Sequence, residues 1–277
     1  GRIFMKKKLI ITFSVIGGII ALVIILLFTL FGLRYVSLDL RTYNSLFSSE
    51  EAQESVISSG KFAYNMPIFF QDKQGYINNL EKSNPYLKVI NIESRFPNTL
   101  VVKCVDREEV FAIKMAEDKF FIVDEDLKVL RIENTFTSTQ TNAILLSLDS
   151  NIHIENAVQA EVGDFLELSA DQELVENISP ALKLNNRNTA EQKALFESVS
   201  VKYRTNPLTA RSEAYLELYD FTGVKMSIME ANDSLALKLN CLLAVHAVFD
   251  PAEASIYELR VLKNSDGDIF CHQTQKS

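Results

Sequence analysis

The sequence predicts an α+β protein with one transmembrane helix, then a small domain of order βααββ and a larger β-rich α+β domain. Three observations predict it. Residues 9–33 form an uncharged apolar run, residues 35–108 alternate strand and helix patterns, and residues 109–263 contain mainly short strand patterns. We expect residues 1–8 to be a basic tail and residues 264–277 a C-terminal tail.

The apolar run from Leu9 to Leu33 is long enough to be a membrane span. At about 1.5 Å per helical residue it extends about 37 Å, against a hydrocarbon core of about 30 Å. A cleaved signal peptide is the competing interpretation. Its apolar core has about 7–15 residues and ends in a small-x-small site, whereas this run ends in the bulky stretch from Leu30 to Arg34. We therefore expect an uncleaved anchor that contacts the lipid bilayer through residues 9–33.

The charges on either side of the run predict its orientation. Arg2, Lys6, Lys7 and Lys8 precede it without an acidic residue, and such basic flanks stay in the cytoplasm. The remainder, residues 34–277, is then outside the cell membrane. Its formal charge is −12, because the whole chain carries −8 and the first eight residues carry +4. An acidic ectodomain repels phosphate backbones, so we expect no nucleic-acid partner.

Five patterns in sequence make up the small domain. Tyr35–Arg41 alternates as a half-buried strand, and Ser48 with Glu51 forms a capping box that opens a helix. Gly75–Asn84 predicts a second helix, which ends before a proline. Two strands and the turn at residues 95–98 complete the domain. The strands are Leu87–Arg95, with Ile90 and Ile92 on one face, and Thr99–Glu108, with Leu100, Val102 and Cys104 on one face.

Short strand patterns and three helix patterns predict the larger domain. The strands are Val110–Met115, Lys119–Val123, Leu127–Ile132, Ala143–Leu148, Ser200–Thr205, Glu213–Tyr219, Val224–Ile228 and Ser255–Lys263. The helices are Ser169–Leu184, Thr189–Ser198 and Asp233–Phe249. We expect Ser255–Lys263 to be the last strand, with Tyr257, Leu259 and Val261 on one face, because residues 264–267 form a turn.

The chain lacks the sequence patterns of common catalytic sites. It has no Gly-rich phosphate loop, no CxxC pair, no HExxH and no Gly-x-Ser-x-Gly elbow, and its three histidines are scattered. We therefore expect no catalytic residue, no cofactor and no metal site. The three cysteines, Cys104, Cys241 and Cys271, cannot all pair internally, and we expect buried lone thiols.

Several short motifs carry a family resemblance. Residues 92–103, Ile-Glu-Ser-Arg-Phe-Pro-Asn-Thr-Leu-Val-Val-Lys, resemble the hydrophobic-x-Arg-x-Pro-x-Thr-Leu-x-Ile turn of the FtsQ/DivIB family of bacterial cell-division proteins. Further similar segments are Asp106–Val110, Phe121–Asp124, Gly163, Lys238-Leu239 and Glu258–Val261. The chain departs from the family pattern at Glu109, Leu127, Met229 and Val261.

The resemblance implies a POTRA domain at residues 35–108 and a non-catalytic scaffold in the cell membrane at the division septum. Its implied partners are other single-span division proteins, of the FtsB/DivIC and FtsL type. Strand addition to the last strand would use Arg260, Val261, Leu262 and Lys263, since an edge strand exposes unpaired backbone groups. The alternative is an inner strand with no free edge.

Two other functional classes stay open. A membrane-anchored receptor or sensor ectodomain would need a ligand pocket and a cytoplasmic output domain, whereas only about eight residues are expected inside. A membrane-tethered hydrolase would need a converging nucleophile and base or metal ligands, and no such pattern is visible.

Overall fold

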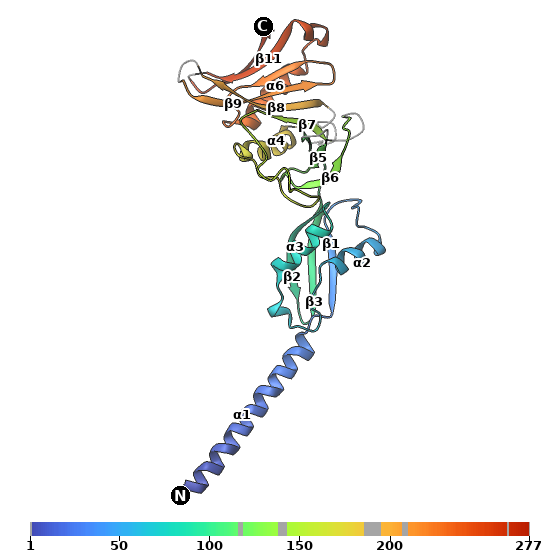
Figure 1. The fold of residues 1–277 in the computed structure, drawn as a ribbon, viewed down its shortest axis with the longest axis vertical. Helices are drawn as coiled ribbons and strands as arrows, with labels where there is room; N and C mark the ends of the chain where they lie inside the picture. Colours follow the sequence, from blue (N-terminus) through green and yellow to red (C-terminus); the bar gives the residue numbers. More distant parts are fainter. Residues whose placement is uncertain are drawn as a thin grey trace. The chain divides into compact units, whose positions relative to one another are not determined.

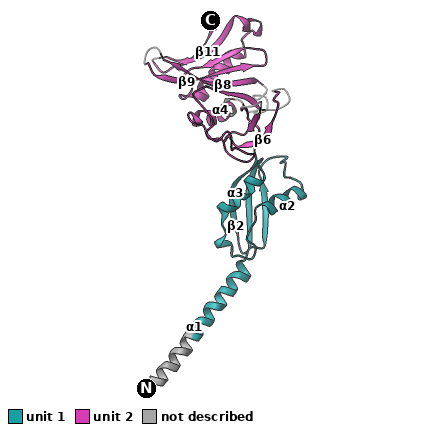
Figure 2. Cartoon of the chain, viewed as in Figure 1, with its two compact units in different colours: residues 1–107 teal, residues 108–277 magenta. Residues whose placement is uncertain are grey.

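The computed structural model describes residues 2–115, 119–137, 143–185, 195–206, 210–264 and 266–276. The chain forms two compact units, Gly1–Arg107 and Glu108–Ser277 (Figure 2). The predicted α+β class, with an N-terminal apolar helix followed by a small and a larger β-containing part, is confirmed.

Helix α1, Arg2–Phe31, opens unit 1. Its segment Ser14–Phe31 is long and apolar enough to cross a membrane, with a mean hydropathy of 2.8 and none of it buried by the rest of the protein. The helix ends two residues before the predicted limit of the span. Leu33 is fully buried, and its backbone N–H donates to the carbonyl of Met66 at 2.9 Å. Leu33 therefore belongs to the core of unit 1 rather than to the exposed apolar run of α1.

The rest of unit 1 is a three-stranded sheet with two helices packed on it (Figure 1). Its elements are β1 (Tyr35–Leu40), α2 (Glu50–Ser59), the 3₁₀ turn η1 (Ile68–Phe70), α3 (Lys73–Ser83), β2 (Leu87–Arg95) and β3 (Thr99–Asp106). Strand β3 is central, with β1 parallel on one side and β2 antiparallel on the other. The predicted strand–helix–helix–strand–strand order is confirmed.

The core of unit 1 agrees with the predicted face of β3, because Leu100, Val102 and Cys104 are all fully buried. The predicted face of β2 is wrong. Residue 90 is skipped in the pairing with β3, so Ile90 is 58% exposed while Ile92 is buried. A bulge of this kind inserts one residue and reverses the side-chain alternation. The cap of α2 also differs, since Ser49 rather than Ser48 accepts from the Ala52 N–H.

Unit 2 contains a nine-stranded mixed sheet of order β12-β11-β10-β9-β8-β7-β4-β5-β6. The strands are β4 (Phe111–Lys114), β5 (Phe120–Val123), β6 (Val129–Glu133), β7 (Ile144–Leu148), β8 (Phe196–Thr205), β9 (Ser212–Asp220), β10 (Lys225–Ile228), β11 (Tyr257–Lys263) and β12 (Ile269–Gln275). The helices are α4 (Gln172–Asn185) and α6 (Leu235–His246), and η3 (Pro251–Ser255) is a 3₁₀ turn.

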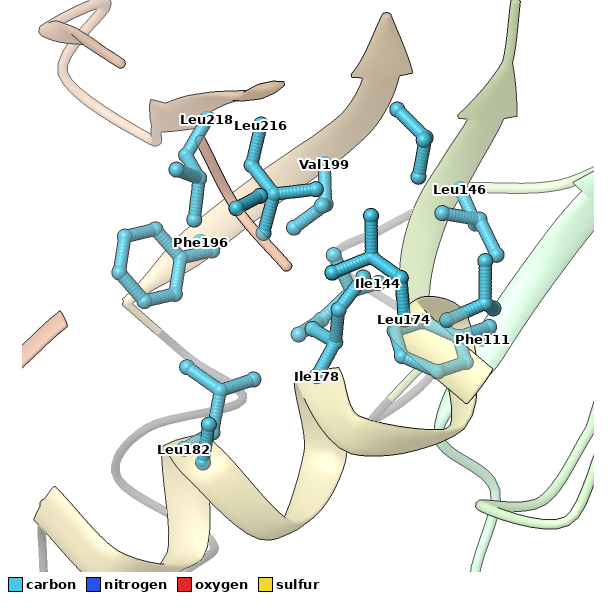
Figure 3. Close-up of a cluster of buried hydrophobic side chains, with 14 of the residues drawn as sticks. Phe111, Ile144, Leu146, Leu174, Ile178, Leu182, Phe196, Val199, Leu216 and Leu218 are labelled. Carbon is cyan, nitrogen blue, oxygen red and sulfur yellow. The ribbon is translucent and has the colours of Figure 1, made fainter. Parts of the chain in front are cut away.

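Helix α4 contributes part of the core beneath this sheet. Its apolar residues Leu174, Ile178 and Leu182 face buried side chains of β4, β7, β8 and β9, among them Phe111 and Phe196 (Figure 3). The predicted helix Thr189–Ser198 is wrong at its end, because β8 begins at Phe196 and pairs with both β7 and β9. The rest of that predicted helix, up to residue 194, lies outside the described residues.

Candidate partner-binding edge

The chain after Lys263 folds back as a β-hairpin, so the predicted C-terminal tail is wrong. Strand β12 pairs antiparallel with β11 along its whole length, from Tyr257 opposite Gln275 to Lys263 opposite Ile269. The Asn264 side chain holds the turn, where its Oδ1 accepts from the backbone N–H of Asp266 at 3.0 Å and of Asp268 at 2.8 Å. Gly267 supplies a positive φ of 93°, which favours glycine.

Strand β11 lies between two partners, so Arg260 to Lys263 do not form a free edge. On one side β10 runs parallel, and the Val261 carbonyl accepts from the N–H of Met229. On the other side Arg260 pairs with His272 and Leu262 pairs with Phe270, both of which are on β12. Because β12 occupies the position where a partner strand was predicted, the free-edge prediction is wrong. Binding by the side chains of these residues stays a prediction.

The free edge at this end of the sheet of unit 2 lies one strand further out, along β12. The sheet's other terminal strand is β6, whose first residue, Val129, is bonded on its outer side to a loop. There the Val129 N–H donates to the carbonyl of Asp164, and the Gly163 N–H donates to the carbonyl of Val129, both at 2.8 Å. No strand among the described residues pairs with the outer side of β12.

Two hydrogen bonds at the ends of the hairpin identify which backbone groups of β12 face outward. The Asn264 N–H donates to the carbonyl of Asp268, and the Lys276 N–H donates to the carbonyl of Ile256. In an antiparallel pair, hydrogen-bonded and non-hydrogen-bonded positions alternate. Even-numbered residues of β12 therefore bond to β11. The N–H and C=O groups that face outward belong to Ile269, Cys271, Gln273 and Gln275.

The two faces of the hairpin differ in character. Ile269 and Cys271 pack against the hydrophobic core, and α6 lies against β10, β11 and β12. The opposite face carries a ladder of alternating charges that crosses β8 to β11. Its members are Lys202, Glu217, Lys225, Glu258 and Arg260, joined by ion pairs of 2.5 to 3.1 Å.

The three cations of the charge ladder stabilise its two carboxylates. Burial alone would raise the pKa of Glu217, but the hydrogen bonds and charges of Lys202 and Lys225 outweigh burial and hold that pKa below its usual value. Beyond the ladder, on the same face, Phe270 and His272 have ring centroids 5.8 Å apart. A strand added to β12 would therefore meet an apolar layer on one side and a polar face on the other.

The chemistry of this edge is that of backbone recognition. Among the residues that the structure describes, no group of three or more His, Cys, Asp or Glu side chains could hold a metal ion. His272 is on β12 and His246 is on α6, where its Nε2 lies 2.8 Å from Oδ2 of Asp220. The edge instead offers donors and acceptors at the spacing of a β-strand.

Comparison with known families identifies unit 1. Residues 49–107 match the family described as "POTRA domain, FtsQ-type". The chain carries an FtsQ-type POTRA domain. It is also 25% identical over 107 residues to the "Cell division protein DivIB" of Clostridium acetobutylicum, an alignment that covers 39% of this chain and 39% of that protein. The chain thus matches less than half of that relative's length. The predicted resemblance to the FtsQ/DivIB family is confirmed.

The POTRA domain contains two of the motifs that carried the resemblance. The turn at residues 95–98 joins β2 to β3, and Arg95 is opposite Thr99. Arg107 follows β3 directly and lies 3.0 Å from Glu81 on α3. In unit 2, Lys238 is fully buried, and its ammonium donates to the carbonyls of Met229 and Glu230. These motif residues hold the fold together.

Sequence reasoning missed β12, the strand that provides the edge. One local signal was present, because Asp266-Gly267 is a strong hairpin dipeptide when strands flank it. The strand itself lacks a clear pattern of alternating apolar residues. Its second half is Gln273-Thr274-Gln275, which matches an edge strand that is largely exposed.

Proposed function

We propose that this protein is a non-catalytic scaffold of bacterial cell division, which links other single-span division proteins to the septal peptidoglycan machinery. Support comes from the FtsQ-type POTRA domain, the likeness to a DivIB protein and the single apolar helix α1. The observation that carries the proposal is the outer edge of β12, with which no strand among the described residues pairs.

The proposed mechanism is strand addition. An extended segment of a partner of the FtsB/DivIC or FtsL type would pair with the outward groups of Ile269, Cys271, Gln273 and Gln275. Main-chain hydrogen bonds provide affinity in this mode, and alternate side chains provide specificity. The exposed Phe270 ring, the half-buried His272 ring and the neighbouring Arg260 would then contact side chains of the added strand.

The membrane anchor sets where this scaffold acts. We propose that α1 spans the cell membrane with residues 1–8 in the cytoplasm, and that both units lie outside it at the division septum. This protein and a single-span partner would then be held in the same membrane, which raises the effective concentration of each for the other.

Proline scanning of β12 tests this proposal. Gln273→Pro removes an outward N–H, and an edge strand tolerates proline when the lost N–H faces away from the sheet. We expect it to abolish capture of the FtsB/DivIC-type partner while the melting temperature of the protein stays nearly unchanged. Gln273→Ala is the matched control, because it removes the same side chain and its bond to Glu253 but keeps the N–H.

A second variant separates edge loss from unfolding. Thr274→Pro removes an N–H that bonds to β11, so it should lower the melting temperature as well as partner capture. The edge is not the binding site if Gln273→Pro captures partner as well as Gln273→Ala does. The same conclusion follows if capture persists after deletion of residues 269–277.

A further inference from the structure

Three phenylalanine rings meet where α1 enters the POTRA domain. Phe31 is the last residue of α1, and its ring centroid lies 5.3 Å from that of Phe69 and 6.4 Å from that of Phe96. The rings of Phe69 and Phe96 are 5.4 Å apart. Both are more than half exposed, as is the neighbouring Phe70, and Met66 is also exposed. We call Met66, Phe69, Phe70 and Phe96 the aromatic end of the domain.

The loop that carries most of the aromatic end is held in place by polar groups beneath it. The buried Gln71 side chain donates to the carbonyls of Ala63 and Met66 at 3.0 and 2.8 Å. The Tyr76 hydroxyl accepts from the Ala63 N–H and donates to Gln71. A loop fixed in this way holds its exposed apolar side chains at one position on the surface.

The same loop is joined directly to the end of α1. The N–H of Leu33 donates to the carbonyl of Met66, and the N–H of Asn65 donates to the carbonyl of Leu33, both at 2.9 Å. Gly32 permits this approach, because a Cβ there would lie 2.8 Å from the Asn65 carbonyl oxygen and 2.4 Å from that of Phe28. The aromatic end is therefore fixed at the level where the apolar helix stops.

We propose that the aromatic end is a membrane-docking surface, inserted in the interface of the bilayer that α1 spans. The apolar stretch of α1 continues to Phe31, so rings in contact with Phe31 lie at the edge of the hydrocarbon. Aromatic side chains are stable at this depth. Arg34, next to Leu33, and Arg95, next to Phe96, are both exposed. At this depth they would face lipid phosphates.

Docking would fix the POTRA domain against the membrane instead of leaving it tethered by a single chain. The inference rests on α1 as a span and is independent of the β12 edge. A neighbouring protein is the alternative occupant of the aromatic end. If a neighbouring protein rather than the bilayer covers the aromatic end, the aromatic end should stay in water in vesicles that contain only this protein.

Tryptophan fluorescence in vesicles tests the proposal, because the chain has no tryptophan and a single introduced indole reports one position. The full chain is reconstituted in phosphatidylcholine and phosphatidylglycerol vesicles with bromine at defined acyl positions. The probes are Phe70→Trp and Phe96→Trp. Tyr43→Trp is the matched control, since Tyr43 is 92% exposed. It follows β1, whose six residues extend about 20 Å from the aromatic end.

We expect both probes to emit at shorter wavelength than Tyr43→Trp and to be quenched several-fold more, most strongly by bromine near the headgroups. Leu22→Trp, within α1, should be quenched most by deep bromine. If the two probes match Tyr43→Trp in emission and quenching, the proposal is overturned. If Leu22→Trp is not quenched, α1 does not span the bilayer and the proposal fails. That outcome would not bear on capture of a partner by the β12 edge, which is measured in detergent.

Discussion

The guanidinium Nη2 of Arg107 lies 3.0 Å from Oε2 of Glu81, and the two side chains are only 3% and 15% exposed. The other carboxylate oxygen of Glu81 accepts from the Val89 N–H at 2.7 Å. The Arg107 N–H donates to the carbonyl of Tyr86. This ion pair thereby fastens α3 to the start of β2 and to the last residue of unit 1.

Removal of one member of this pair should strongly destabilise the POTRA domain. Glu81→Gln or Arg107→Met removes one charge of a buried, hydrogen-bonded ion pair, and breaking such a pair lowers the free energy of unfolding by about 3–5 kcal/mol. The double variant should cost less than the sum of the two single changes. Denaturant unfolding of the four proteins measures this coupling, and additive effects would show that the pair does not act as a unit.

The core face of β3 gives a second prediction for the same domain. Leu100→Ala should lower the free energy of unfolding by about 2–5 kcal/mol, because it leaves a cavity at a fully buried position. Ile90→Ala is the matched control on the neighbouring strand. Ile90 is the exposed residue of the bulge, so its truncation should cost no more than about 0.5 kcal/mol. Equal denaturant midpoints for the two variants would mean that the strand faces are assigned incorrectly.

A third prediction concerns acid stability of unit 2. Burial alone would raise the pKa of Asp220, but the hydrogen bonds from His246, Val224 and Thr222 outweigh burial and lower it below 3.8. A carboxylate with a lowered pKa contributes stability above its unfolded-state pKa, and this stability is lost as pH falls through the folded-state pKa. Asp220→Asn should therefore flatten the loss of stability below about pH 4. Denaturant titrations at several pH values measure this, and an unchanged slope would exclude Asp220 as the cause.

Local sequence patterns predicted most helices and strands. The strand faces and the edge of the sheet depend on how the strands pair, which local patterns do not show. The alternation at Leu100, Val102 and Cys104 could be read from the sequence because the extra residue of the bulge lies on β2, so β3 itself alternates without interruption. The reversal at Ile90 could not, because a bulge depends on how β2 aligns with β3. Likewise, β11 has the pattern of a half-buried strand whether it is inner or outer. Only the pairing of Arg260 with His272 shows that the edge lies on β12.

The last prediction concerns topology, and the structure changes the probe that should be used. A thiol reagent needs a reactive cysteine, but burial and the nearby Cys241 raise the pKa of Cys271 to about 12. Its thiolate population is too small for efficient labelling. Val158 is fully exposed and lies in unit 2. In a chain whose three cysteines are replaced, Val158→Cys should react with a membrane-impermeant reagent in intact cells whose outer barriers admit it.

Lys6→Cys in the same background should react only after the cells are lysed, because the basic flank of the span is expected in the cytoplasm. The two positions thus give opposite results in one experiment, and unfolding of the protein cannot imitate this contrast. If Lys6→Cys reacts in intact cells and Val158→Cys does not, the orientation is reversed. The edge of β12 would then lie in the cytoplasm, where it could not meet partners outside the membrane.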